Sequence, residues 1–67
     1  MPIAHISLLK GRTKEQKAAM AEDITAAIHK HSGAPRDVIT VVFHEVTQDD
    51  WATAGVLFSN KPAAKKT

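Results

Sequence analysis

The feature that most limits how this chain can fold is residues 38–46, a run rich in β-branched residues whose two alternating faces are both apolar. Valine and isoleucine favour extended backbone, and successive side chains of a strand point to opposite faces. The two faces are Val38, Thr40, Val42 and Val46 on one side and Ile39, Val41 and Phe43 on the other. The run therefore predicts a strand that must be covered on both sides.

A first strand and a turn are predicted before this run. Residues 3–10 alternate in a way that suits a strand, with apolar side chains on both faces. Gly11 and Arg12 form the expected turn, and Thr13 followed by Gln16 has the spacing of a capping box, which opens a helix.

The segment from Lys14 to about Ser32 is predicted to be an amphipathic helix. Gly33 favours the left-handed conformation that ends helices, and Pro35 prevents continuation. The apolar residues expected to face the sheet are Met20, Ile24, Ala27 and Ile28, and the charged residues expected to face solvent are Lys17, Glu22, Asp23 and Lys30.

Strand, helix and strand in this order predict an α/β (α+β) fold, a single βαβ unit with parallel strands. One helix covers only one face of a two-stranded sheet. A chain of 67 residues without cysteine can supplement its small core neither with disulfides nor with a second layer of its own. We therefore expect a second copy of the chain to cover the open face, which makes the protein an obligate homo-oligomer.

The C-terminal part is predicted to be a turn at residues 47–50 and a short hairpin around Gly55. Residues 1–59 are expected to form one domain, and residues 60–67 a basic, disordered tail.

Composition narrows the classes of partner. The net charge is only +2 and no aromatic basic motif accompanies it, which argues against nucleic acid. The four histidines lack the spacing of a metal site, so no metal is expected. No apolar run is long enough to span a membrane and no signal peptide is evident, so a cytoplasmic location is expected.

The N-terminus offers the most direct chemistry. Methionine is usually removed when the next residue is small, and removal of Met1 would leave Pro2 with a free secondary amine. An α-amino group titrates near ~7.7–8.0, and burial or neighbouring cations lower its pKa toward the range of a general base at neutral pH. With Met1 retained, the same nitrogen is an amide without basicity.

Over residues 2–59 the sequence resembles the small 4-oxalocrotonate tautomerase family of the tautomerase superfamily. The shared features lie in order along the chain: Pro2-Ile3-Ala4, Gly11-Arg12-Thr13, Glu15-Gln16-Lys17, Gly33-Ala34-Pro35, and Trp51 followed by Gly55. The resemblance implies a hexamer, usually a trimer of dimers, that uses neither cofactor nor metal to interconvert enol and keto forms of a small 2-hydroxy-alkenoate or 2-oxo acid.

Site residues follow from the same resemblance. Pro2 is implied to be the general base, Arg12 to bind a substrate carboxylate, and Trp51 to line the pocket. Thr40 stands where well-studied members carry a second arginine, and threonine cannot make a bidentate bond to a carboxylate. A monoacid such as phenylenolpyruvate then suits the pocket better than the dicarboxylate 2-hydroxymuconate, unless Arg36 reaches the same place.

Two alternatives stay open: hydration or dehalogenation of an unsaturated acid, with Glu45 or His44 activating water, and a non-catalytic ligand-binding relative.

The length of the first strand limits how the candidate site can be built, whichever function holds. Pro2 and Arg12 lie at opposite ends of one strand, an expected 30 Å or so apart, so they can act on one substrate only if Arg12 comes from a neighbouring chain.

Overall fold

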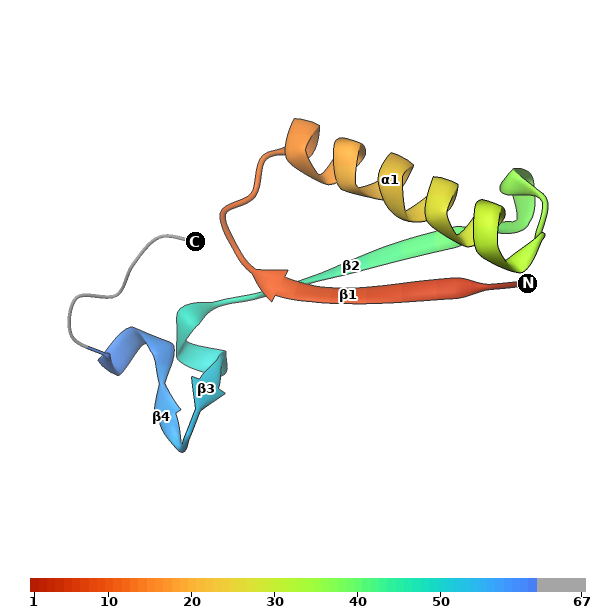
Figure 1. Ribbon diagram of the computed structural model, residues 1–67. Coiled ribbons are helices and arrows are strands. Elements are labelled where there is room, and N and C mark those ends of the chain that lie inside the picture. Colours follow the sequence, from red (N-terminus) through yellow and green to blue (C-terminus); the bar gives the residue numbers. More distant parts are fainter. Residues whose placement is uncertain (62–67) are drawn as a thin grey trace.

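The computed structural model describes residues 1–61 and has two parts, a strand-helix-strand unit and a small hairpin (Figure 1). The unit consists of β1 (Ile3–Leu9), α1 (Lys14–Ser32) and β2 (Thr40–Val46), and the hairpin of β3 (Ala52–Thr53) and β4 (Val56–Leu57). Short 3-10 turns lie at Arg36–Val38, Gln48–Asp50 and Phe58–Asn60. The α+β fold predicted from the sequence is confirmed.

The strands β1 and β2 are parallel, with Ile3 opposite Thr40 and Leu9 opposite Val46. The hydrogen-bond ladder continues one residue beyond each end of β1. The amide of Thr40 donates to the carbonyl of Pro2 at 3.1 Å, and the amide of Lys10 donates to the carbonyl of Val46 at 2.9 Å. The chain therefore enters the sheet at Pro2 and leaves it after Lys10, at the other end of β2.

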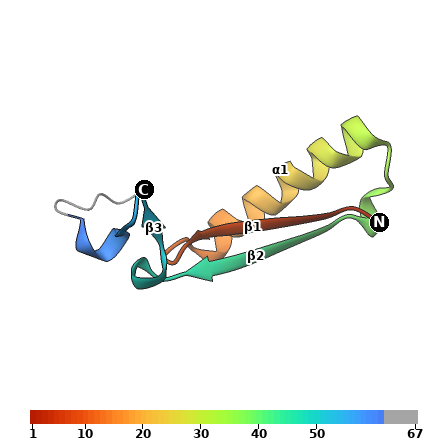
Figure 2. The same cartoon turned by 90° about the horizontal axis from the view of Figure 1, so that it is seen from below.

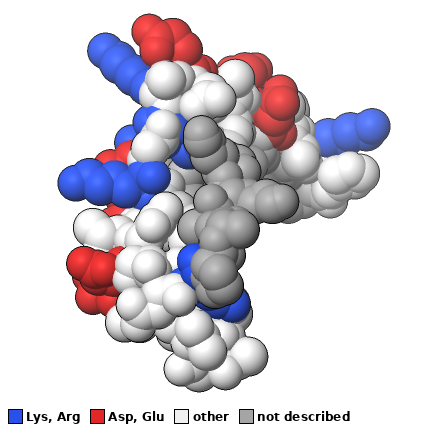
Figure 3. Space-filling view, turned by 90° about the vertical axis from the view of Figure 1, so that its left-hand side faces the viewer, with Lys and Arg blue, Asp and Glu red and all other residues white. Residues whose placement is uncertain are grey.

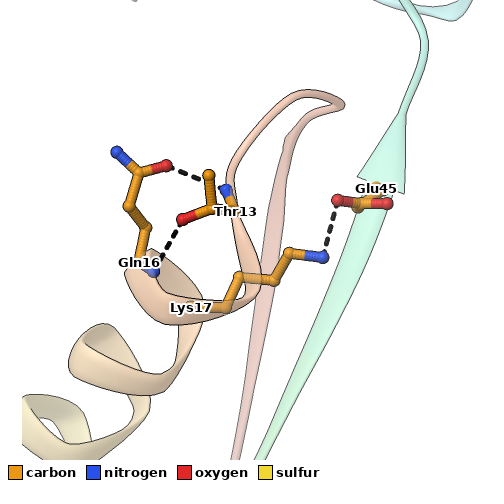
Figure 4. Close-up of polar contacts among 4 residues, drawn as sticks. All are labelled: Thr13, Gln16, Lys17 and Glu45. Carbon is orange, nitrogen blue, oxygen red and sulfur yellow. Dashed lines mark hydrogen bonds and ion pairs between the residues drawn. The ribbon is translucent and has the colours of Figure 1, made fainter.

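Local signals fix both ends of α1. The Thr13 hydroxyl accepts from the amide of Gln16 at 3.0 Å, and the Gln16 side chain accepts from the amide of Thr13 at 2.9 Å (Figure 4). At the other end Gly33 has φ 81°, and its amide donates to the carbonyl of His29 at 3.1 Å. The capping box and the glycine end that the sequence predicts are both present.

Helix α1 lies against one face of the sheet (Figures 1 and 2). Its half-buried residues are Lys17, Met20, Ala21, Ile24, Thr25 and Ile28. Two predictions were wrong: Ala27 is exposed, and Lys17 faces the sheet instead of solvent. The reason for the second is Glu45 of β2, whose carboxylate lies 2.6 Å from the Lys17 ammonium (Figure 4).

Strand β2 begins at Thr40, two residues later than predicted. The preceding residues form a 3-10 turn, in which Val38 donates to the carbonyl of Pro35 and Ile39 to that of Arg36, both at 3.2 Å. The Arg36 guanidinium donates to both carboxylate oxygens of Glu22 on α1, each at 2.9 Å. This contact joins the turn to the helix and holds the entry into β2.

The hairpin of β3 and β4 projects beyond the end of the two-stranded sheet (Figures 1 and 2). Its strands are antiparallel, with Ala52 opposite Leu57 and Thr53 opposite Val56. The two connecting residues, Ala54 and Gly55, have φ 52° and 79°. Positive φ at both central residues is the type I′ geometry that suits two-residue hairpin loops.

Changing Ala54 to asparagine is expected to stabilise the protein by about 1 kcal/mol. A residue with a Cβ pays about 1–2 kcal/mol in the left-handed region, and asparagine recovers part of this cost because its short polar side chain can form local hydrogen bonds. The free energy of unfolding from guanidinium titration measures the gain. Gly55→Ala is the matched control, since it adds the same strain one residue later and is expected to destabilise. Equal stability of the wild type and Ala54→Asn would contradict the turn geometry.

The sheet face opposite α1 is uncovered, and no side chain of residues 1–61 is fully buried. Ile3 on that face is 56% exposed, and Val56 and Leu57 of the hairpin are 44% and 36% exposed. A domain without a buried core is not expected to be stable alone. The structure thus leaves the open face that the sequence argument assigns to a second copy.

Within the described residues, no helix is long and apolar enough to cross a membrane. The predicted tail, residues 60–67, lies largely outside the described part. Of its residues, Asn60 closes the last 3-10 turn and the Lys61 ammonium donates to the Thr53 hydroxyl at 2.6 Å.

Candidate active site

Pro2 lies at the entrance of the sheet, where it is half-buried. Its carbonyl accepts the Thr40 amide at 3.1 Å, so position 40 is the nearest point of β2 to the proline. The prediction that Thr40 lies close to Pro2 is therefore confirmed. Met1, in contrast, is 89% exposed.

Arg12 lies at the opposite end of the molecule, in the turn between β1 and α1, and is half-buried. Pro2 is adjacent to Thr40, and Lys10 is adjacent to Val46. Pro2 and Lys10 are eight residues apart along the strand, which corresponds to about 26 Å. The chain then turns at Gly11, which has φ 128°, so Arg12 lies near this end of the strand. An arginine side chain still cannot span the distance.

Trp51 follows the 3-10 turn after β2 and is also half-buried. Its carbonyl accepts the amide of Phe58 at 2.6 Å, which closes the base of the hairpin. The hairpin lies at the Arg12 end of the sheet, away from the N-terminus (Figure 1). Seen from this end, basic and acidic side chains alternate over the visible surface and do not form a single basic patch (Figure 3).

One chain therefore carries the three candidate residues in two separate places, with Pro2 at one end and Arg12 and Trp51 at the other. No single copy can bring Pro2 and Arg12 to one small substrate. If both act on the same molecule, the site forms between copies, and assembly is a condition for chemistry.

Other charged residues that the sequence analysis considered are engaged elsewhere. Arg36 holds Glu22 through two hydrogen bonds, which argues against its serving as a replacement for the missing arginine. The Lys17 ammonium, by its hydrogen bond and charge, holds the pKa of the Glu45 carboxyl below its usual range. Glu45 is thus an ionised partner of Lys17 rather than a group poised to take a proton from water.

His44, the other candidate for activating water, faces His5 across the strands, with 3.5 Å between Nδ1 of His5 and Nε2 of His44. Glu45 and His44 both lie toward the far end of β2 from Pro2. They are therefore not placed to assist Pro2 within one chain. No sequence pattern indicates this pair, and only the strand register, with Ser7 opposite His44, brings the two histidines together. Among residues 1–61, no cluster of three or more potential metal ligands is present.

Comparison with known proteins gives a consistent result. The family model described as tautomerase enzyme matches residues 2–61. A probable tautomerase of Bacillus cereus is 41% identical over 61 residues, which cover 91% of this chain and all of that protein. The 2-hydroxymuconate tautomerase of Comamonas testosteroni is 43% identical over 56 residues, 84% of this chain and 89% of that one.

A solved structure extends the comparison to three dimensions. The heterohexamer 4-oxalocrotonate tautomerase from Chloroflexus aurantiacus superimposes with a TM-score of 0.86 and 28% identity, over 90% of this chain and 97% of the matched one.

Proposed function

Because the chain belongs to the tautomerase family, we propose that it is an enol–keto tautomerase of a small 2-hydroxy-alkenoate or 2-oxo acid, with Pro2 as general base. The observation that carries this proposal is the family match from residue 2 to residue 61, which includes the proline and both other candidate residues. The activity requires no cofactor, because the reaction only moves a proton within the substrate.

In the proposed reaction the free amine of Pro2, exposed after removal of Met1, accepts the proton of the substrate's enol hydroxyl. The resulting ammonium returns a proton to the carbon at the other end of the conjugated system, which gives the ketone. Arg12 of a neighbouring copy binds the substrate carboxylate, and Trp51 forms part of the pocket wall. The protein works as a homo-oligomer, with a hexamer as the expected form.

The structure of the chain and a related protein both support the proposed homo-oligomer. Residues 1–61 contain no fully buried side chain, and the candidate residues lie at opposite ends of the chain. A related protein, the Chloroflexus tautomerase, is a heterohexamer. Contacts between copies would supply both the missing core and the complete site.

Thr40 points to a monoacid substrate. It is adjacent to Pro2, and its hydroxyl offers a single neutral hydrogen bond where an arginine would offer two charge-assisted ones. We expect kcat/KM for phenylenolpyruvate to exceed that for 2-hydroxymuconate. Changing Thr40 to arginine is expected to raise kcat/KM for the dicarboxylate by about tenfold or more, since a charged hydrogen bond contributes about 1.5–3 kcal/mol.

The test is ultraviolet monitoring of both enols with protein whose N-terminal mass shows that Met1 is absent. Thr40→Val is the matched control, because it removes the hydroxyl without adding charge. Turnover of neither enol by such protein, together with ligand-induced thermal stabilisation, would instead identify a non-catalytic binding relative. A preference for the dicarboxylate in the wild type would contradict the role assigned to Thr40.

A further inference from the structure

The chain has two arginines, and they lie at opposite ends of the sheet. Arg12 is in the turn after β1, whereas Arg36 is in the 3-10 turn that leads into β2. The turn that contains Arg36 lies beside the N-terminus in both views of the fold (Figures 1 and 2). The Pro2 end of the chain therefore has a guanidinium of its own, which comes from the same copy as the proline.

Arg36 is close to the proline along the backbone. The amide of Ile39 donates to the Arg36 carbonyl at 3.2 Å, and a turn of this kind brings its first and fourth Cα atoms within about 7 Å. Thr40 follows directly, and its amide donates to the Pro2 carbonyl at 3.1 Å. The Cα atoms of Arg36 and Thr40 are thus less than about 11 Å apart. A long arginine side chain and a small acid can bridge this distance together.

Pro2 and Arg36 also share one side of the sheet. Glu45 contacts α1, so its partner Leu8 on β1 faces the helix as well. Because side chains alternate along a strand, Pro2 falls on the same side as Leu8, and both are half-buried. The Arg36 side chain reaches α1 on this side, where it contacts Glu22. The guanidinium and the proline therefore lie at the same end and on the same side of the sheet.

Glu22 of α1 holds this guanidinium. One terminal nitrogen of Arg36 donates to both carboxylate oxygens of Glu22, each at 2.9 Å. The side chains of Arg36 and Glu22 are 46% and 65% exposed, and an ion pair this open to solvent contributes little free energy. Glu22 thus keeps the guanidinium turned toward the helix through a contact that a substrate carboxylate could replace once Glu22 is gone.

We propose that Glu22 is a specificity-determining residue: by holding Arg36, it withholds a guanidinium from the Pro2 end of the site and keeps the enzyme selective for monoacids. When released, Arg36 binds the second carboxylate of a dicarboxylate substrate. This inference rests on the proposed function and deepens it, because it names a helix residue that sets the charge of the preferred substrate. Thr40 accounts for the missing charge beside Pro2, and Glu22 accounts for the failure of Arg36 to supply one.

Changing Glu22 to alanine tests the proposal, and alanine suits an exposed helix position. We expect the ratio of kcat/KM for 2-hydroxymuconate to kcat/KM for phenylenolpyruvate to rise about two- to fivefold, the range that release from an exposed ion pair allows. The gain should appear as a lower KM for the dicarboxylate with little change in kcat, because the second carboxylate takes no part in the chemical step.

Three control variants separate release of Arg36 from other effects. Arg36→Gln breaks the same ion pair without freeing a guanidinium, so the ratio should not rise, and the double variant Glu22→Ala/Arg36→Gln should lose the gain. Asp23→Ala removes the same charge from the adjacent exposed position of α1 and should also keep the wild-type ratio. A wild-type ratio in Glu22→Ala, or a rise that Asp23→Ala or the double variant shares, would overturn the proposal.

Binding of unreactive acids makes the test independent of turnover. The probes are fumarate, a dicarboxylate without an enol, and crotonate, the corresponding monoacid, both measured by isothermal titration calorimetry. We expect Glu22→Ala to bind fumarate about two- to fivefold more tightly than the wild type and crotonate equally well.

The two readouts distinguish failure of this inference from failure of the proposed function. If the chain converts neither enol but Glu22→Ala shows the tighter binding of fumarate, only the proposed activity is refuted. If the enols are converted and Glu22→Ala changes neither the ratio nor the affinity for fumarate, only the role of Glu22 is refuted. Absence of both turnover and fumarate binding would refute both.

Discussion

Changing Pro2 to leucine is expected to lower kcat/KM for phenylenolpyruvate by about 10²- to 10⁴-fold, the usual contribution of a positioned general base. A large second residue blocks removal of Met1, so the nitrogen at position 2 stays an amide and cannot accept a proton. Initial rates at pH 7–8 measure the loss, and the intact mass identifies the retained methionine. The leucine side chain would occupy the half-buried place of the proline at the sheet entrance, so circular dichroism and the oligomer mass should be close to those of the wild type.

Pro2→Ala is the matched control for this experiment. Alanine is small enough for Met1 to be removed, which leaves a basic but primary amine that the pyrrolidine ring no longer holds in place. Its activity is expected to lie between those of the wild type and Pro2→Leu. Full activity in Pro2→Leu with Met1 retained would remove the nitrogen at position 2 from the mechanism, whereas full activity in Pro2→Ala would show only that the pyrrolidine ring is not needed.

The elements that the sequence predicts well are those set by short-range signals. Thr13 and Gln16 are three residues apart, and the bonds between them require no other part of the fold. Gly33 ends the helix through its own backbone conformation. The parallel pairing of the strands follows from the single helix between them, because a crossover of that length returns the chain to the same end of the sheet.

Features that depend on long-range register were harder to predict. Helical periodicity places Lys17 with the solvent-facing charges, yet the position of Glu45 on β2 draws it to the sheet. The pairing of His5 with His44 depends on register too, because a slip of one residue would put the two side chains on opposite faces.

The candidate site could be predicted only in part, because it also depends on contacts between residues far apart in the sequence or in different copies. That Pro2 and Arg12 lie at opposite ends follows from the strand between them, and the structure bears this out. Which surfaces of two copies meet depends on contacts outside the single chain, and these contacts decide whether Arg12 and Trp51 reach the proline of a neighbour.

Changing Arg12 to alanine is expected to lower kcat/KM by roughly 30- to 1,000-fold, equivalent to about 2–4 kcal/mol for a charge-assisted contact to the substrate carboxylate. Arg12→Lys is the matched control. It keeps the positive charge but not the bidentate geometry, so an intermediate loss is expected. Since Arg12 also takes part in contacts of the folded chain, the oligomer mass of each variant must be compared with that of the wild type.

Mixed assemblies of Pro2→Ala and Arg12→Ala chains separate a site shared between copies from a site within one chain. If each site takes its proline from one chain and its arginine from another, random assembly from an equal mixture gives both intact residues in about a quarter of the sites. Activity should then rise well above that of either variant, to about a quarter of the wild-type value.

For this test the two variants are unfolded together, reassembled and checked by native mass spectrometry, and each variant alone is treated in the same way. If both residues acted from one chain, no site in the mixture would be intact. Activity that stays at the average of the two variants would therefore refute the shared site, whatever the substrate.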